Sequence, residues 1–128
     1  MQMKQHINRP VHLDLLKIRQ PVTALVSILH RASGVLMVFL IPVLIYGFDL
    51  SLRNAESFHQ ISTLLQSDAV KWLVVIAAWA LAHHLFAGVR FLLLDFHIGI
   101  TKHNARRSAW LVHAGAAIVA LLTIGAIL

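Results

Sequence analysis

Residues 27–48, SILHRASGVLMVFLIPVLIYGF, join a polar start to a long apolar run, and this combination decides the fold class. Further apolar segments cover about 70–94 and 109–128, and each is close to the ~20 residues that a helix needs to cross a bilayer. The segments lack the alternation of barrel strands, and three strands cannot close a barrel. The sequence therefore predicts an all-α membrane protein with three transmembrane helices, at about 24–50, 70–95 and 108–128.

The composition agrees with this prediction. The chain has 128 residues, of which 59% are hydrophobic and 12% charged, and its mean hydropathy is +0.77. A soluble domain usually carries about 25% charged residues. Three spans leave no room for a soluble catalytic domain, so we expect a single membrane-anchor domain over residues 1–128 that works with partner helices. The absence of cysteine excludes disulfides, thiolate iron–sulfur ligation and cysteine zinc sites in this chain.

Basic residues predict the orientation. The arm over residues 1–23 has no apolar signal-peptide region and contains Lys4, Arg9, Lys17 and Arg19. The connection between the second and third spans contains Lys102, Arg106 and Arg107, whereas the C-terminal tail has no basic residue. By the positive-inside rule, the N-terminus is expected in the cytoplasm and the C-terminus in the periplasm. Anionic lipids account for the net charge of +6, and no nucleic-acid partner is expected.

Polar residues at the mouth of the first span are the first candidate site. On a helix, positions i, i+3 and i+4 share a face, so Ser27, His30 and Arg31 cluster above Gly34. A glycine at that depth allows a backbone or a flat ligand to approach closely. The alternative is that the two basic side chains extend to lipid phosphates.

A histidine within the second span is the second candidate. The helical positions within about 40° of His84 form a stripe of three small residues that ends in a carboxylate: Ala77, Ala80, Gly88 and Asp95. The neighbouring His83 projects towards the flank that carries Arg90. A histidine between small residues suits an axial haem ligand, because the porphyrin must lie flat against the helix. The alternative is a buried histidine that makes an interhelical hydrogen bond.

The two candidate sites are expected at similar depths in the membrane. His84 precedes Asp95 by eleven residues, which places it roughly 16 Å from that end of the span. The first helix runs in the opposite direction and starts on the same side of the membrane. A haem ligated by His84 would therefore have its propionates within reach of His30 and Arg31, whose planar guanidinium pairs well with carboxylates.

Four stretches carry a resemblance to a known family. RPVHLDL at 9–15, the proline at position 21, SILHRASG at 27–34 and HLFAGVRFLLLDF at 84–96 resemble the cytochrome b membrane-anchor subunit of succinate dehydrogenase, respiratory complex II, in its bacterial form. The resemblance covers most of the chain, including the lengths of the spans. It differs at Arg90-Phe91, where many relatives have arginine–histidine, and at His83, which adds a histidine beside the expected ligand.

The resemblance implies specific residue roles. Ser27 and Arg31 match positions that bind ubiquinone, His84 matches the axial ligand of the haem iron, and His30 and Arg31 match side chains near the haem propionates. Asp95 matches an acidic position that is a candidate proton relay. His83 stays an alternative ligand in a shifted register, and His113 is interpreted as a packing or interfacial histidine, with ligation as the alternative.

The resemblance also implies the complex and its location. Its partners would be a flavoprotein, an iron–sulfur protein and a second small anchor that supplies the other axial histidine of a shared haem b. The complex would lie in the bacterial inner membrane and pass electrons from the iron–sulfur subunit to ubiquinone, and this chain alone would have no activity. The alternatives are the anchor of a related fumarate reductase, a purely structural anchor, and a small transporter component.

Overall fold

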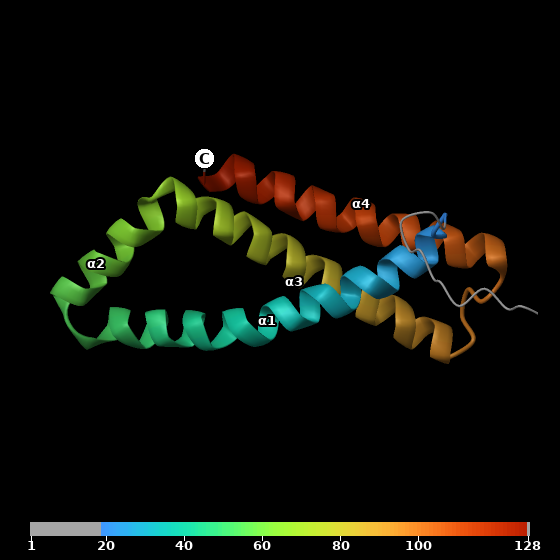
Figure 1. Ribbon diagram of the computed structural model, residues 1–128, viewed down its shortest axis with the longest axis horizontal. Coiled ribbons are helices and arrows are strands. Elements are labelled where there is room, and N and C mark those ends of the chain that lie inside the picture. Colours follow the sequence, from blue (N-terminus) through green and yellow to red (C-terminus); the bar gives the residue numbers. More distant parts are fainter. Residues whose placement is uncertain (1–18, 128) are drawn as a thin grey trace, which may run out of the picture.

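The computed structural model describes residues 19–127, and these residues form four helices and no strand. The helices are α1 (Val22–Arg53), α2 (Ala55–Gln66), α3 (Asp68–Asp95) and α4 (Lys102–Ile127), as Figure 1 shows. Helices α1, α3 and α4 are long and apolar enough to cross a membrane. The prediction of an all-α protein with three spans is confirmed. Most of the expected N-terminal arm, including the stretch at 9–15, lies outside the described residues.

The connection between the first two spans differs from the sequence-based expectation, because it contains a helix. Helix α2 follows directly on α1, and Asn54 caps its start by accepting a hydrogen bond from the Ser57 N–H at 2.8 Å. The segment is too short and too polar to resemble a span. Helix α4 also begins earlier than expected, at Lys102 instead of about 108, where the Thr101 hydroxyl contacts the N–H of Asn104.

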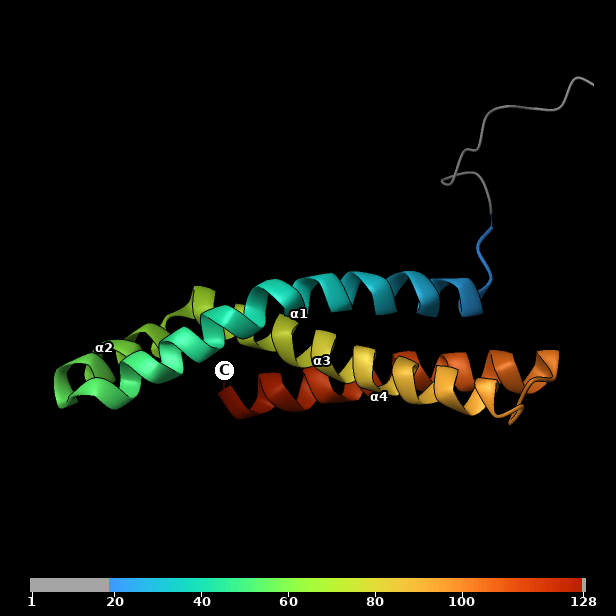
Figure 2. The ribbon, with the colours of Figure 1, turned by 90° about the horizontal axis from the view of Figure 1, so that it is seen from below.

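The three spans form two layers. Helix α1 lies over the pair formed by α3 and α4, as the second view shows clearly (Figure 2). The start of α1, the end of α3 and the start of α4 meet at one end of the bundle, while α2 joins the spans at the other end (Figure 1). We call the first of these the loop end. This arrangement confirms the expectation that the first span starts where the second one finishes.

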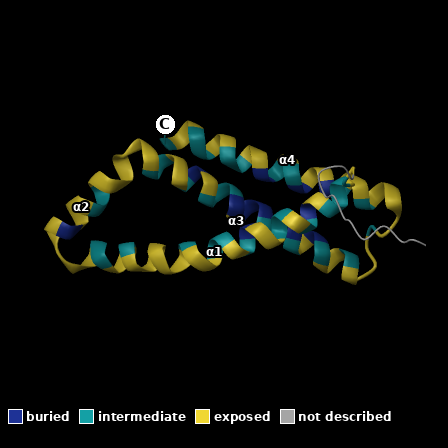
Figure 3. Cartoon of the chain, in the orientation of Figure 1, coloured by how far each residue is buried: buried dark blue, intermediate teal, exposed yellow. Residues whose placement is uncertain are grey.

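Buried residues concentrate where α1 crosses α3 and where α3 packs on α4 (Figure 3). Val26 on α1, Ala87 on α3, and Ala109 and Val112 on α4 form one core cluster. Small side chains let membrane helices approach closely, and the packing contacts then stabilise the bundle. Most large apolar side chains are exposed instead, as expected for a surface that meets lipid or partner helices.

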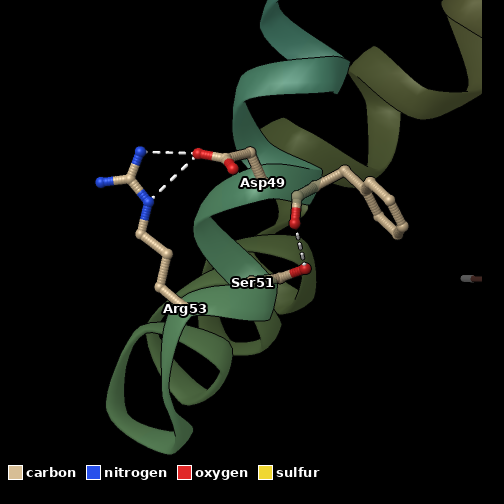
Figure 4. Close-up of polar contacts among 4 residues, drawn as sticks. Asp49, Ser51 and Arg53 are labelled. Atoms are coloured by element: carbon tan, nitrogen blue, oxygen red, sulfur yellow. Dashed lines mark hydrogen bonds and ion pairs between the residues drawn. The ribbon is translucent and has the colours of Figure 1, made fainter.

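The ends of the spans have local explanations. Near the C-terminus of α1, Arg53 pairs with Asp49 at 2.6 Å and the Ser51 hydroxyl donates to the Phe48 carbonyl oxygen (Figure 4). Helix α1 contains Pro42, whose missing N–H interrupts the backbone hydrogen bonds, and it bends along its length (Figure 2). After α3 the chain reverses through His97 and Gly99, which both adopt positive φ.

Candidate functional site

The centre of the site is a hydrogen bond between α3 and α1. His84 Nδ1 lies 3.0 Å from the backbone carbonyl oxygen of His30. A carbonyl oxygen only accepts, so Nδ1 carries the ring proton and donates it. The lone pair of the neutral imidazole is therefore on Nε2, and this nitrogen has no hydrogen-bond partner among residues 19–127.

A serine supports this hydrogen bond. Ser33 is buried, with 1% of its surface exposed, and its hydroxyl donates to the same His30 carbonyl oxygen at 2.9 Å. Its Oγ also lies 3.4 Å from His84 Nδ1. Ser33 was not predicted as a site residue from the sequence, although its i+3 spacing from His30 was an available signal.

Stacking fixes the plane of the His84 ring. The His30 ring lies parallel to it with centroids 4.0 Å apart and an interplanar angle of 16°. Phe91 packs edge-on against His30, with centroids 5.3 Å apart. The Phe91 ring therefore packs against the histidine pair on the side of His30.

Two glycines make room for the pair. A Cβ at Gly34 would lie 3.0 Å from Cε1 and 3.4 Å from Nδ1 of His84, which is tighter than ordinary packing contacts. A Cβ at Gly88 would lie 3.7 Å from His30 Nε2, an ordinary contact. Gly34 therefore sets how closely α1 approaches His84, whereas Gly88 lies against the His30 ring.

His84 faces a groove along α1. This groove, which we call the α1 groove, has a volume of about 680 Å³, within the range of small-molecule sites. Its lining combines His30, Arg31, Gly34 and His84 with apolar side chains of α1, namely Val35, Met37, Val38 and Ile41. Arg31 is exposed, and its Nε donates to the Ser27 backbone carbonyl oxygen at 3.3 Å. His84 and Arg31 thus line one largely apolar groove.

Two predicted site residues lie apart from this groove. Ser27 is half-buried one turn before Arg31, and its hydroxyl makes no hydrogen bond with the described residues. Asp95 is exposed at the loop end of α3 and makes no ion pair within residues 19–127. The structure therefore brings His30, Arg31 and His84 together, and leaves Ser27 and Asp95 outside the lining of the groove.

His83 and Arg90 share a flank of α3 away from His84, as the helical projection predicts, and the structure packs this flank against α4. His83 is fully buried, and its ring lies 5.3 Å from that of His113 and 5.5 Å from that of Trp79. Neither His83 ring nitrogen finds a hydrogen-bond partner among residues 19–127. His83 therefore has no access to the α1 groove, and His113 packs within the α3–α4 interface.

Together these features define a class: a membrane chain with three candidate spans and a histidine site between the first two of them. Comparison with known protein families makes this more specific. The family described as succinate dehydrogenase/fumarate reductase transmembrane subunit matches residues 5–123. The chain belongs to this family.

Curated relatives agree with the family match. The succinate dehydrogenase cytochrome b556 subunit of Coxiella burnetii is 37% identical over 105 residues, which cover 81% of this chain and 84% of the relative. The b556 subunit of Paracoccus denitrificans is 30% identical over 117 residues, covering 91% and 90%. The cytochrome b560 subunit of Porphyra purpurea is 29% identical over 101 residues, covering 77% and 81%. The resemblance stated from the sequence motifs, a cytochrome b membrane-anchor subunit of succinate dehydrogenase, is confirmed.

Proposed function

We propose that this membrane anchor binds a b-type haem through His84 and ubiquinone close to Arg31 and Ser27, and that it passes electrons from the iron–sulfur subunit to ubiquinone. The observation that carries the proposal is the hydrogen bond from His84 Nδ1 to the His30 carbonyl oxygen. It assigns the proton to one ring nitrogen and leaves the other as a ligand atom beside an apolar groove.

The residues fit a haem. Histidines that ligate metals almost always donate their other N–H to a carboxylate, a carbonyl or water, which orients the ring and raises its basicity. His84 has this arrangement, with Ser33 and the stacked His30 ring holding it in place. Arg31 lines the same groove and would pair with a propionate. The haem, when bound, supplies a one-electron redox centre.

Polar side chains near the loop end of α1 form the proposed quinone site. The Ser27 hydroxyl has no partner among the described residues and would donate to a quinone carbonyl oxygen. The Arg31 guanidinium would stabilise negative charge that develops on a quinone oxygen, more strongly in a dry site than in water. Asp95, at the same end of the bundle, is the proposed proton relay.

The proposed function also implies an orientation of the chain in the membrane and a set of partner subunits. We place the loop end in the cytoplasm, because its basic residues obey the positive-inside rule, so the C-terminus lies on the periplasmic side of a bacterial inner membrane. The expected partners are a flavoprotein, an iron–sulfur protein and a second small anchor that ligates the same haem. The exposed apolar surface of α1 supports this, since only Val26 and Ser33 are buried in that helix.

The ligand assignment is tested by His84→Ala in the complete complex. The reduced minus oxidised spectrum of the purified complex should lose or strongly diminish its b-type bands, while His83→Ala, which changes the buried neighbour, should keep them. An unchanged spectrum in His84→Ala rejects His84 as the ligand.

The quinone assignment is tested by Arg31→Gln. Ubiquinone reduction by succinate should fall at least tenfold, because a charge-assisted hydrogen bond contributes about 1.5–3 kcal/mol. Succinate oxidation by an artificial dye should be retained. Arg53→Gln, at the other end of α1, is the matched control. An equal loss of both activities in Arg31→Gln favours a purely structural anchor.

A further inference from the structure

Arg90 is a buried cation that donates hydrogen bonds to neutral groups. Only 6% of the Arg90 surface is exposed, and the residue belongs to α3, a helix that is long and apolar enough to cross a membrane. Its Nε donates to the Ser108 hydroxyl at 3.0 Å and its Nη2 to the Ala105 carbonyl oxygen at 3.2 Å, so both partners are neutral. Burying a charge is costly unless an opposite charge compensates it, and no carboxylate of residues 19–127 pairs with Arg90.

The guanidinium lines a groove between α3 and α4. This groove, which we call the α3–α4 groove, has two adjoining parts with volumes of about 520 and 380 Å³. Both parts share the side chains of Arg90, Leu93, Ser108 and Leu111. Because Arg90 faces α4, this groove is separate from the α1 groove that His84 lines.

The two parts of the groove differ in chemistry. The part at the loop end adds Arg107 and Asn104, so two arginines, an amide and a hydroxyl converge there. The other part extends along the spans past Phe86 to Gly115 and is lined almost wholly by apolar groups. No carboxylate in the part of the chain that the structure describes lines either part. The ligand that matches this pattern has an anionic head and a hydrocarbon tail.

The charged residues around the loop-end part of the α3–α4 groove favour an anion at that position. Helix α4 begins with Lys102 and has no acidic residue in its first turn, so its positive dipole end is surrounded by cations. Basic pockets between transmembrane helices, near the membrane surface, bind the head groups of anionic lipids. We propose that an anionic phospholipid occupies the α3–α4 groove, with its phosphate on Arg90 and Arg107 and an acyl chain along Leu93, Leu111 and Phe86.

The experiment compares two neighbouring arginines. Arg106 and Arg107 are both exposed in the first turns of α4, but only Arg107 lines the groove. The complete complex, with its partner chains, would be placed in nanodiscs of phosphatidylcholine containing phosphatidylglycerol, and retained lipid would be counted by native mass spectrometry. Arg107→Gln should weaken phosphatidylglycerol retention roughly fivefold, as expected for one basic residue near the surface, and Arg106→Gln should leave it unchanged.

A change at Arg90 itself should have a larger effect than a change at Arg107. Arg90→Gln should lower retention tenfold or more where the variant assembles, since it removes the charge that the groove buries. Equal losses in Arg106→Gln and Arg107→Gln would mean diffuse surface attraction and would overturn the site, as would unchanged retention in Arg107→Gln. Equal retention of phosphatidylcholine, or complete displacement by inorganic phosphate, would overturn the lipid assignment.

The remaining alternative is that a helix of another subunit fills the groove. A photoreactive side chain at Leu111, which is exposed and lines both parts, distinguishes these occupants. Cross-linking to phosphatidylglycerol supports the proposal, and cross-linking to a protein chain refutes it.

Discussion

Replacing Gly34 with alanine tests how closely α1 packs on His84. The added Cβ would lie 3.0 Å from His84 Cε1, so the imidazole or the helix must shift by a few tenths of an ångström. Overpacking of this kind costs about 1–3 kcal/mol. Alanine also improves helix propensity by about 1 kcal/mol relative to glycine. The net expectation for Gly34→Ala is a change between about zero and 2 kcal/mol of destabilisation.

Gly47→Ala is the matched control for this change. Gly47 lies in the same helix, and a Cβ there would meet nothing within 4 Å. The control therefore gains helix propensity without a clash, and the two variants should differ by about 1–3 kcal/mol. The assays are the Tm of the purified complex and its reduced b-type absorbance.

Two results are expected together. Gly34→Ala should lower the Tm relative to Gly47→Ala, and it should also shift or weaken the haem bands, because the displaced ring would lose its alignment with the His30 carbonyl oxygen. If the two variants have the same Tm and the same spectrum, Gly34 does not set the position of His84.

Gly115→Ala should destabilise the packing of α3 on α4 by about 1–3 kcal/mol, because its Cβ would lie 2.9 Å from Phe86 Cε2. The control is Gly125→Ala, where a Cβ meets nothing within 4 Å. Equal Tm values for the two variants would contradict this packing. Ser33→Ala should cost about 0.5–1 kcal/mol and shift the haem absorption, because the hydroxyl no longer supports the hydrogen bond of His84. Differential scanning fluorimetry and reduced-state spectra measure both effects, and an unchanged Ser33→Ala complex would show that the hydroxyl has no such role.

The helical periodicity of the sequence was sufficient to place the adjacent residues His83 and His84 on different faces of α3. Neighbouring positions on a helix differ by about 100°, so the projection of α3 puts His84 on one side and both His83 and Arg90 on another. The structure has this arrangement, with His84 facing α1 and His83 facing α4. The spans were predictable for a similar reason, because a long apolar run has few structures available in a bilayer.

Other features needed contacts that are distant in the sequence. The helical spacing placed the His30 side chain near His84, but the hydrogen bond is made by the His30 backbone carbonyl, with Ser33 beside it. Which atoms meet depends on the rotation and depth of α1 relative to α3, and packing of the whole bundle sets both. Helix α2 is too short to appear as a span-length apolar run and was not predicted, although Phe58, Ile61 and Leu65 recur at helical spacing.

The sequence by itself therefore determined the three spans, the family, and the face of α3 on which each polar residue lies, because helical geometry depends only on neighbouring residues. Only the tertiary structure decided that the His84 proton goes to a carbonyl on α1, and that the Arg90 charge is buried against the neutral groups of α4. These contacts join residues on different helices, and close packing at small side chains fixes the distances between them.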